Sequence, residues 1–142
     1  MAAVAQAVGD GMDGTSGALY SIWFSGLVQA LRDVVEQEQV KEVTLPVWTK
    51  ALRIALNKLY TYTRARPPSR TLVDPLAAFV QTLEDGEGLE SAVGKAGVAA
   101  EATKDLEAKA GRAAYVEREK VKGISDPGAV AVRYILEAFV GK

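Results

Sequence analysis

The chain has 142 residues, which is long enough for a hydrophobic core, and we expect one domain over residues 1–142. Its formal net charge of −1 favours neither nucleic acid nor an anionic membrane surface as a partner. It contains no cysteine and no histidine, which excludes disulfides, thiolate or imidazole zinc sites and the Ser-His-Asp triad.

A glycine-rich turn leads into an uncharged apolar helix near the N-terminus. Gly14, Thr15 and Ser16 precede the apolar run 18–24, while residues 1–13 are expected to be flexible. Glycine allows a tight turn, hydroxyl side chains cap helices, and the first N–H groups of the helix point back at the turn. Such a junction can bind an anion, typically a phosphate. The alternative interpretation is a well-capped helix without a ligand.

A P-loop interpretation of this region is rejected, and a membrane-associated helix around residues 22–28 is kept as a third, less favoured alternative. Residues 9–16 carry two glycines at P-loop spacing, but Thr15 stands where the lysine belongs and no apolar strand comes before it. Residues 14–31 are uncharged, yet their hydroxyl side chains, glutamine and glycines favour a buried core helix over a membrane span. No signal peptide is recognisable, so we expect a cytoplasmic protein without membrane contact.

Helical spacing continues through the middle of the chain. Apolar residues recur every three or four positions from Trp48 to Tyr62, which predicts a helix capped by Thr44 with Pro46 in its first turn. A shorter helix is expected between about residues 72 and 83, closed by an Asp-Gly turn.

A long alanine-rich helix and a final helix complete the pattern. Residues 89–113 keep helical spacing, and their small side chains imply the close approach of a neighbouring helix. The last helix includes residues 132–139, with Asp126 as its N-cap and Pro127 at its first position. No strand pattern is recognisable. We therefore predict an all-α fold, an antiparallel up-and-down bundle or barrel of about five helices in which alternate loops share one end.

Four segments in this order resemble one family. Residues 12–19 are similar to Met-Gly-Gly-Thr-Ser-Gly-Ala and residues 70–76 to Gly-Asp-Arg-Thr-Met-X-Asp. Both are motifs of the ATP-binding L-type (DhaL-like) domain of dihydroxyacetone, or glycerone, kinases. A third segment, residues 99–104 followed by 110–115, and a fourth, residues 125–129, are similar to two further segments of that domain. The resemblance covers the chain from about Gly11 onward and implies the C-terminal two-thirds of the family's eight-helix barrel.

The resemblance implies a site for Mg-ATP at one end of the barrel. Gly14, Thr15 and Ser16 would hold phosphate oxygens, which agrees with the anion site expected from the residues alone. Arg112 would pair with the phosphates, a contact that suits the bidentate geometry of a guanidinium. From the residues alone, Arg112 is equally well a surface partner of Glu107 or a charge at a helix end.

The nucleoside end of the site is implied at two helix starts. Leu72 stands where the family has a methionine that packs on the adenine, although an apolar residue is more often part of a core. Asp126, Pro127 and Gly128 would close the pocket, and Asp126 caps its helix under either interpretation.

Several positions depart from the family pattern. The family's Gly-Asp-Gly-Asp magnesium loop is expected upstream of this sequence, and no residue here is assigned as a metal ligand. Asp10 and Asp13 imitate that loop in composition, but Asp13 places a negative charge beside the presumed phosphate turn. Thr63 adds bulk where the family often has glycine, and Pro68 and Ser69 replace Gly-Asp.

The expected function follows from the resemblance. The chain would be the nucleotide-binding portion of a kinase that transfers a phosphoryl group from Mg-ATP to dihydroxyacetone. It would act only together with a dihydroxyacetone-binding (K-type) domain or chain, which holds its substrate through a histidine. Related enzymes also cyclise the FMN half of FAD. The alternative is a non-catalytic helical interaction protein that self-associates through exposed apolar helices.

Overall fold

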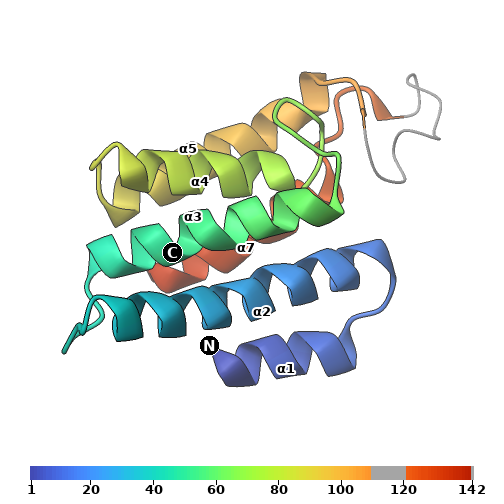
Figure 1. Cartoon of the computed structure of the whole chain (residues 1–142). Coiled ribbons are helices and arrows are strands. Elements are labelled where there is room, and N and C mark those ends of the chain that lie inside the picture. The colour runs from blue at the N-terminus through green and yellow to red at the C-terminus, as the bar shows by residue number, and fades with distance from the viewer. Residues whose placement is uncertain (110–120, 142) are drawn as a thin grey trace. The chain divides into compact units, whose positions relative to one another are not determined.

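Every regular element in the described part of the chain is a helix, which confirms the predicted all-α fold. The computed structural model describes residues 1–109 and 121–141. Its elements are α1 (Ala2–Gly11), α2 (Gly14–Gln37), α3 (Leu45–Tyr62), α4 (Val73–Glu84), α5 (Leu89–Ala102), the 3₁₀ turn η1 (Thr103–Asp105) and α7 (Pro127–Phe139) (Figure 1). The chain divides into two compact units, Met1–Thr63 and Arg64–Lys142.

In the first unit, α2 and α3 pack against each other through apolar faces. Trp23 and Leu27 on α2 are 4% and 3% exposed, and Ala55 and Leu59 on α3 are fully buried. Their spacing of four puts each pair on one side of its helix, as the apolar pattern predicts. Thr44 is the N-cap residue of α3 as expected, although its hydroxyl makes no capping hydrogen bond.

The N-terminal residues form a helix that the sequence pattern did not predict. α1 contacts α2, and none of its side chains is buried. Four alanines within its ten residues explain the helical form, because alanine has the highest helix propensity. None of the described helices combines the length and apolar character that crossing a bilayer requires.

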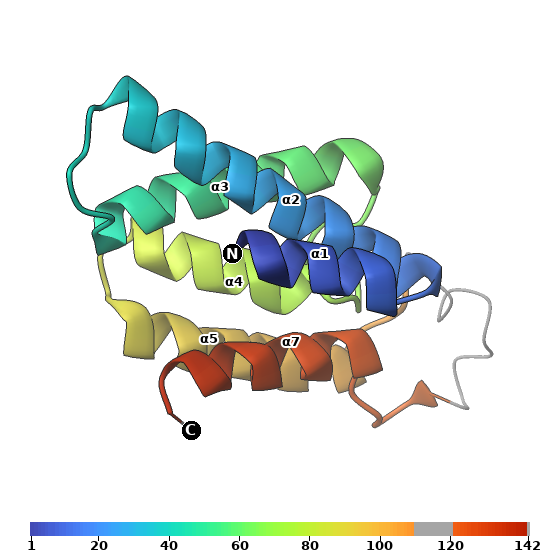
Figure 2. The same cartoon turned by 90° about the horizontal axis from the view of Figure 1, so that it is seen from below.

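In the second unit, α5 contacts both α4 and α7. Ala92, Ala96 and Ala100 are fully buried along one stripe of α5, and Val80 of α4 and Val132 of α7 are buried with them. Figure 2 shows α5 and α7 lying side by side. The predicted close approach of a helix to the alanine stripe is therefore confirmed.

The alanine-rich helix is shorter than predicted. Instead of continuing to residue 113, α5 ends at Ala102 and passes into η1. The hydroxyl of Thr103 donates to the Ala100 carbonyl at 2.5 Å and accepts the Asp126 N–H at 2.8 Å. These bonds to Thr103 compete with continuation of the helix, and one comes from a distant part of the chain.

Candidate functional site

The predicted phosphate turn lies at the start of α2. Gly14 has a φ of +75°, a conformation that glycine adopts without a steric penalty. Asp13 is the N-cap residue, but its side chain makes no capping hydrogen bond. Thr15 and Ser16 are exposed in the first turn. This long helix therefore presents first-turn N–H groups that Asp13 does not cap, together with two hydroxyls, and that combination suits an anion.

The turn packs closely against Gly17, in the first turn of α2. A Cβ atom at Gly17 would lie 2.1 Å from the carbonyl oxygen of Met12, closer than atoms can approach. The N–H of Met12 in turn donates to the Val8 carbonyl at 3.1 Å, at the end of α1. The backbone of the turn therefore lies directly against the first turn of α2, and only glycine at position 17 permits it.

The carboxylates near this turn do not form a metal centre. Asp10 in α1 and Asp13 at the cap are both exposed. Within the described ranges, no three or more histidine, cysteine, aspartate or glutamate side chains are grouped so that they could hold a metal ion. A magnesium ion bound here would therefore depend on phosphate oxygens or on ligands from elsewhere.

In the second unit, Asp74 organises the loop that leads to Leu72. Asp74 is 5% exposed, and its carboxylate accepts the N–H of Ser69 at 2.9 Å and the N–H of Thr71 at 2.8 Å. The hydroxyl of Ser69 also donates to it at 3.1 Å. Hydrogen bonds to a charged acceptor are among the stronger ones, so this loop is firmly anchored at the start of α4.

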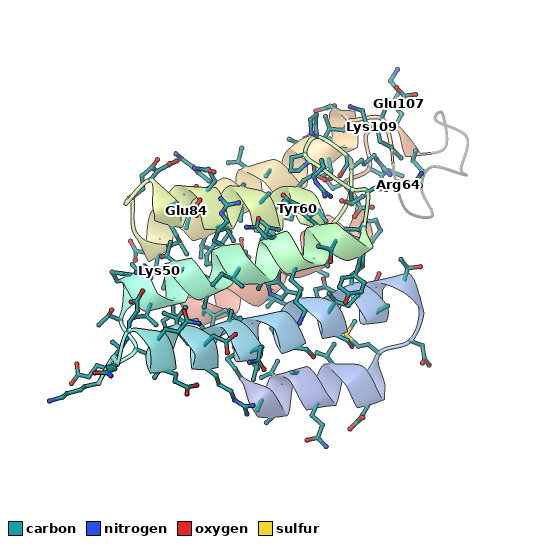
Figure 3. The ribbon with its side chains drawn as sticks, viewed as in Figure 1. Lys50, Tyr60, Arg64, Glu84, Glu107 and Lys109 are labelled. Carbon is teal, nitrogen blue, oxygen red and sulfur yellow. The ribbon has the colours of Figure 1, made fainter. Side chains whose placement is uncertain are left out.

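The segment after η1 adds a further bond to this loop. The backbone N–H of Lys109 donates to the carbonyl of Ser69 at 3.2 Å. Lys109 and Glu107, both labelled in Figure 3, lie on this segment. The loop around Ser69 is thus bonded on one side by Asp74 and on the other by the backbone after η1.

The structure brings Leu72 together with the start of α7. A Cβ atom at Gly128 would lie 3.4 Å from the Cβ of Leu72 and 3.0 Å from Oδ2 of Asp126. Oδ2 of Asp126 accepts the N–H of Ala129 at 2.9 Å, so Asp126 is the N-cap residue that the sequence predicts. Leu72 is only 5% exposed, which agrees with its alternative interpretation as a core residue.

Burial raises the pKa of Asp126, the carboxylate at this junction. The N–H of Ala129 and the positive charge of Arg70 act in the opposite direction, but the loss of hydration is the larger effect. Asp126 therefore binds a proton more readily than an ordinary aspartate.

Arg70 is a residue of this junction that the sequence analysis did not assign to the site. Its side chain is 2% exposed, and Nη2 donates to the carbonyls of Val121 at 3.2 Å and Ile124 at 2.8 Å. The signal that could have found it is its place in the motif of residues 70–76, where it is the only cation.

Arg112, the predicted partner of the phosphates, lies outside the residues that the structure describes.

An open hollow of about 590 Å³ between α5 and α7 contains none of the predicted site residues. Its walls carry the ion pairs Lys104–Glu101 and Arg133–Glu137, each at 2.7 Å. Its charged side chains thus largely satisfy one another, and we assign no ligand to it.

Comparison with known proteins decides the family. The model of the DAK2 domain matches residues 1–141. The chain belongs to the DAK2 domain family. This DAK2 domain is 44% identical over 143 residues to dihydroxyacetone kinase 2 of Saccharomyces cerevisiae, covering 96% of this chain and 24% of that protein. It is 36% identical over 137 residues to the triokinase/FMN cyclase of Homo sapiens, covering 91% of this chain and 22% of that protein.

A solved structure agrees with this assignment. The crystal structure of the dihydroxyacetone kinase of C. freundii, in its native form, superposes with a TM-score of 0.66 at 27% identity. The match covers 97% of this chain and 22% of that chain. This DAK2 domain therefore spans about a quarter of the length of the curated relatives it matches.

Proposed function

We propose that this DAK2 domain binds an adenine nucleotide with magnesium and serves as the nucleotide-binding portion of a dihydroxyacetone kinase. The observation that carries the proposal is the contact of Leu72 with Gly128 beside Asp126, two segments far apart in the sequence. Both segments belong to the motifs that resemble nucleotide-binding motifs of the family. Leu72 and residues 126–128 would receive the nucleoside end of the ligand.

The phosphate end is assigned to the start of α2. Gly14, Thr15 and Ser16 supply N–H groups, two exposed hydroxyls and the positive end of a long helix. Arg112 would add a guanidinium, whose two parallel N–H donors suit phosphate oxygens. These groups differ from those near Leu72, so the two ends of the ligand can be tested separately.

Magnesium and the phosphoryl acceptor require partners. Since the described residues contain no group of three metal-binding side chains, we propose that phosphate oxygens and carboxylates from another segment or chain complete the magnesium site. A dihydroxyacetone-binding domain or chain would supply the acceptor hydroxyl. The domain would then hold and orient ATP while the partner presents the substrate for phosphoryl transfer.

Thermal unfolding with and without ATP and magnesium tests this proposal. A ligand at 100 times its Kd adds about 2.7 kcal/mol to stability, which raises the Tm of a domain of this size by several degrees. We expect such a rise with Mg-ATP and its loss in the double variant Thr15→Ala and Ser16→Ala. Thr49→Ala, which removes an exposed hydroxyl of α3, is the matched control. An unshifted Tm in the wild-type protein would contradict nucleotide binding, and a full shift in the double variant would contradict the assigned turn.

The second candidate is a non-catalytic interaction protein descended from the same domain. Exposed apolar side chains favour it, because Val98 of α5 is 71% exposed and Tyr134 and Phe139 of α7 are 64% and 62% exposed. Self-association through these side chains would appear as a concentration-dependent mass in sedimentation equilibrium. A constant monomer mass would remove this candidate.

A further inference from the structure

Arg70 combines three unusual properties. It is a buried cation, only 2% exposed. Its φ of +58° lies in the left-handed region that residues other than glycine seldom adopt. Its Nε atom is buried and has no hydrogen-bond partner within residues 1–109 and 121–141. Burial of a charged group and a left-handed backbone are both unfavourable, so the surrounding structure must hold Arg70 in place.

The side chain of Arg70 binds the turn 121–124. Nη2 donates to two carbonyls of the turn 121–124, at 2.8 and 3.2 Å. The turn is also bonded to η1, because the N–H of Gly123 within the turn donates to the Lys104 carbonyl at 3.2 Å. Because the turn is followed directly by Ser125 and Asp126, fixing the turn also fixes the entry into α7.

The backbone of Arg70 is itself anchored. Its two neighbours, Ser69 and Thr71, both donate their backbone N–H groups to the buried carboxylate of Asp74. Hydrogen bonds therefore tie the two neighbours of Arg70 to the start of α4, and the Arg70 guanidinium ties the same loop to the turn 121–124, which precedes α7 in the chain. These two helix starts are the ones that bring Leu72 against Gly128.

We propose that Arg70 is a positioning residue that holds the turn 121–124, so that residues 126–128 lie against Leu72 and form the nucleoside end of the site. Arg70 does not touch the ligand, because its side chain is buried beneath the turn. This inference rests on the proposed nucleotide-binding function. It goes further because it separates the two parts of the ligand. Arg70 supports binding of the adenosine part of ATP and has no effect on binding of the phosphate part.

Two ligands and three variants test this division. Affinities for ATP and for inorganic tripolyphosphate, both with magnesium, are measured by calorimetry on wild type, Arg70→Gln and Arg70→Lys. Arg133→Gln removes a cation that lies on α7 away from the turn and serves as the control. Loss of one hydrogen bond to a charged group weakens binding affinity by roughly ten- to hundredfold. Arg70→Gln should weaken ATP at least about tenfold and tripolyphosphate less than about twofold.

The conservative variant separates positioning from general structure. Lysine can still donate to one of the two carbonyls, so Arg70→Lys should lie between wild type and Arg70→Gln for ATP. If Arg70→Gln does not fold, the comparison of ATP with tripolyphosphate is made on Arg70→Lys. Equal weakening of both ligands, or no weakening of ATP, would overturn the inference.

Hydrogen exchange distinguishes failure of this inference from failure of the proposed function. If the wild-type protein binds neither ligand, the nucleotide proposal fails on its own. The role of Arg70 is still decided by amide exchange in residues 123–129, which should accelerate at least about tenfold in Arg70→Gln while α2 is unchanged. Unaltered exchange in that segment would overturn the positioning role, whatever the ligand data show.

Discussion

Gly17 and Asp126 each show how one side chain, or its absence, sets the local geometry of the candidate site. At position 17 the missing side chain matters, because the Met12 carbonyl occupies the space of a Cβ atom. At position 126 the carboxylate matters, because it caps α7 and is half-buried beside a buried cation. Gly17 lies next to the residues that are proposed to bind phosphate, and Asp126 is one of the residues that are proposed to receive the nucleoside.

Gly17→Ala should destabilise the first unit and alter the phosphate turn. The new Cβ would lie 2.1 Å from the Met12 oxygen, so the backbone of the turn has to shift. Forced backbone shifts of this kind typically cost about 1–3 kcal/mol, and we expect a lower Tm and a smaller shift with Mg-ATP. Gly11→Ala is the matched control, since a Cβ atom there meets nothing within 4 Å. A Gly17→Ala protein with wild-type Tm and ATP response would show that the turn tolerates a side chain.

Asp126→Asn should change the pH dependence of stability. The folded-state pKa of Asp126 is raised above its ordinary value of 3.8, chiefly by burial. Its contribution to stability is therefore fully present below pH 3.8 and declines as the pH rises through the folded-state pKa. Asparagine can still cap the helix but does not titrate.

The measurement for this prediction is the Tm of both proteins from about pH 3.5 to 7, a range set by the pKa of an ordinary aspartate. The difference, Tm of Asp126→Asn minus Tm of wild type, should increase as the pH rises. A difference that stays constant or decreases would mean that burial does not raise the pKa of Asp126.

At the scale of elements, α5 is defined by the contrast between its two sides. Ala96 is fully buried among α4 and α7, whereas a Cβ atom at Gly94 meets nothing within 4 Å. Ala96→Leu should therefore overpack the second unit and lower its stability by about 1–3 kcal/mol. Gly94→Ala should raise stability by about 0.5–1 kcal/mol, because glycine is unfavourable inside a helix. Chemical denaturation measures both changes, and a neutral Ala96→Leu would show that α5 can move away from its neighbours.

The elements also show what the sequence could and could not predict. Apolar spacing and cap residues predict α2, α3, α4 and α7 because these signals are local. The end of α5 was not predictable, since the bond between Thr103 and Asp126 joins distant segments. The approach of Leu72 to residues 126–128 agrees with the family motifs. The role of Arg70 was missed because its acceptors are backbone carbonyls 51 and 54 residues away.

At the scale of the whole molecule, the chain is a DAK2 domain whose relatives are much longer proteins. It spans 24% of the yeast kinase and 22% of the human triokinase/FMN cyclase. The proposed phosphate turn belongs to the first compact unit, and the proposed nucleoside contacts belong to the second. Phosphoryl transfer on our proposal therefore depends on a dihydroxyacetone-binding partner and on additional magnesium ligands.

The buried guanidinium of Arg70 has a consequence for how this family can diverge. It recognises main-chain carbonyls, and every amino acid supplies the same carbonyl. The residues at positions 121 and 124 are then free to drift between relatives while the contact persists. Correlated substitution between position 70 and this turn would be absent, so methods that infer contacts from paired changes would overlook this hydrogen-bonded link within the second unit.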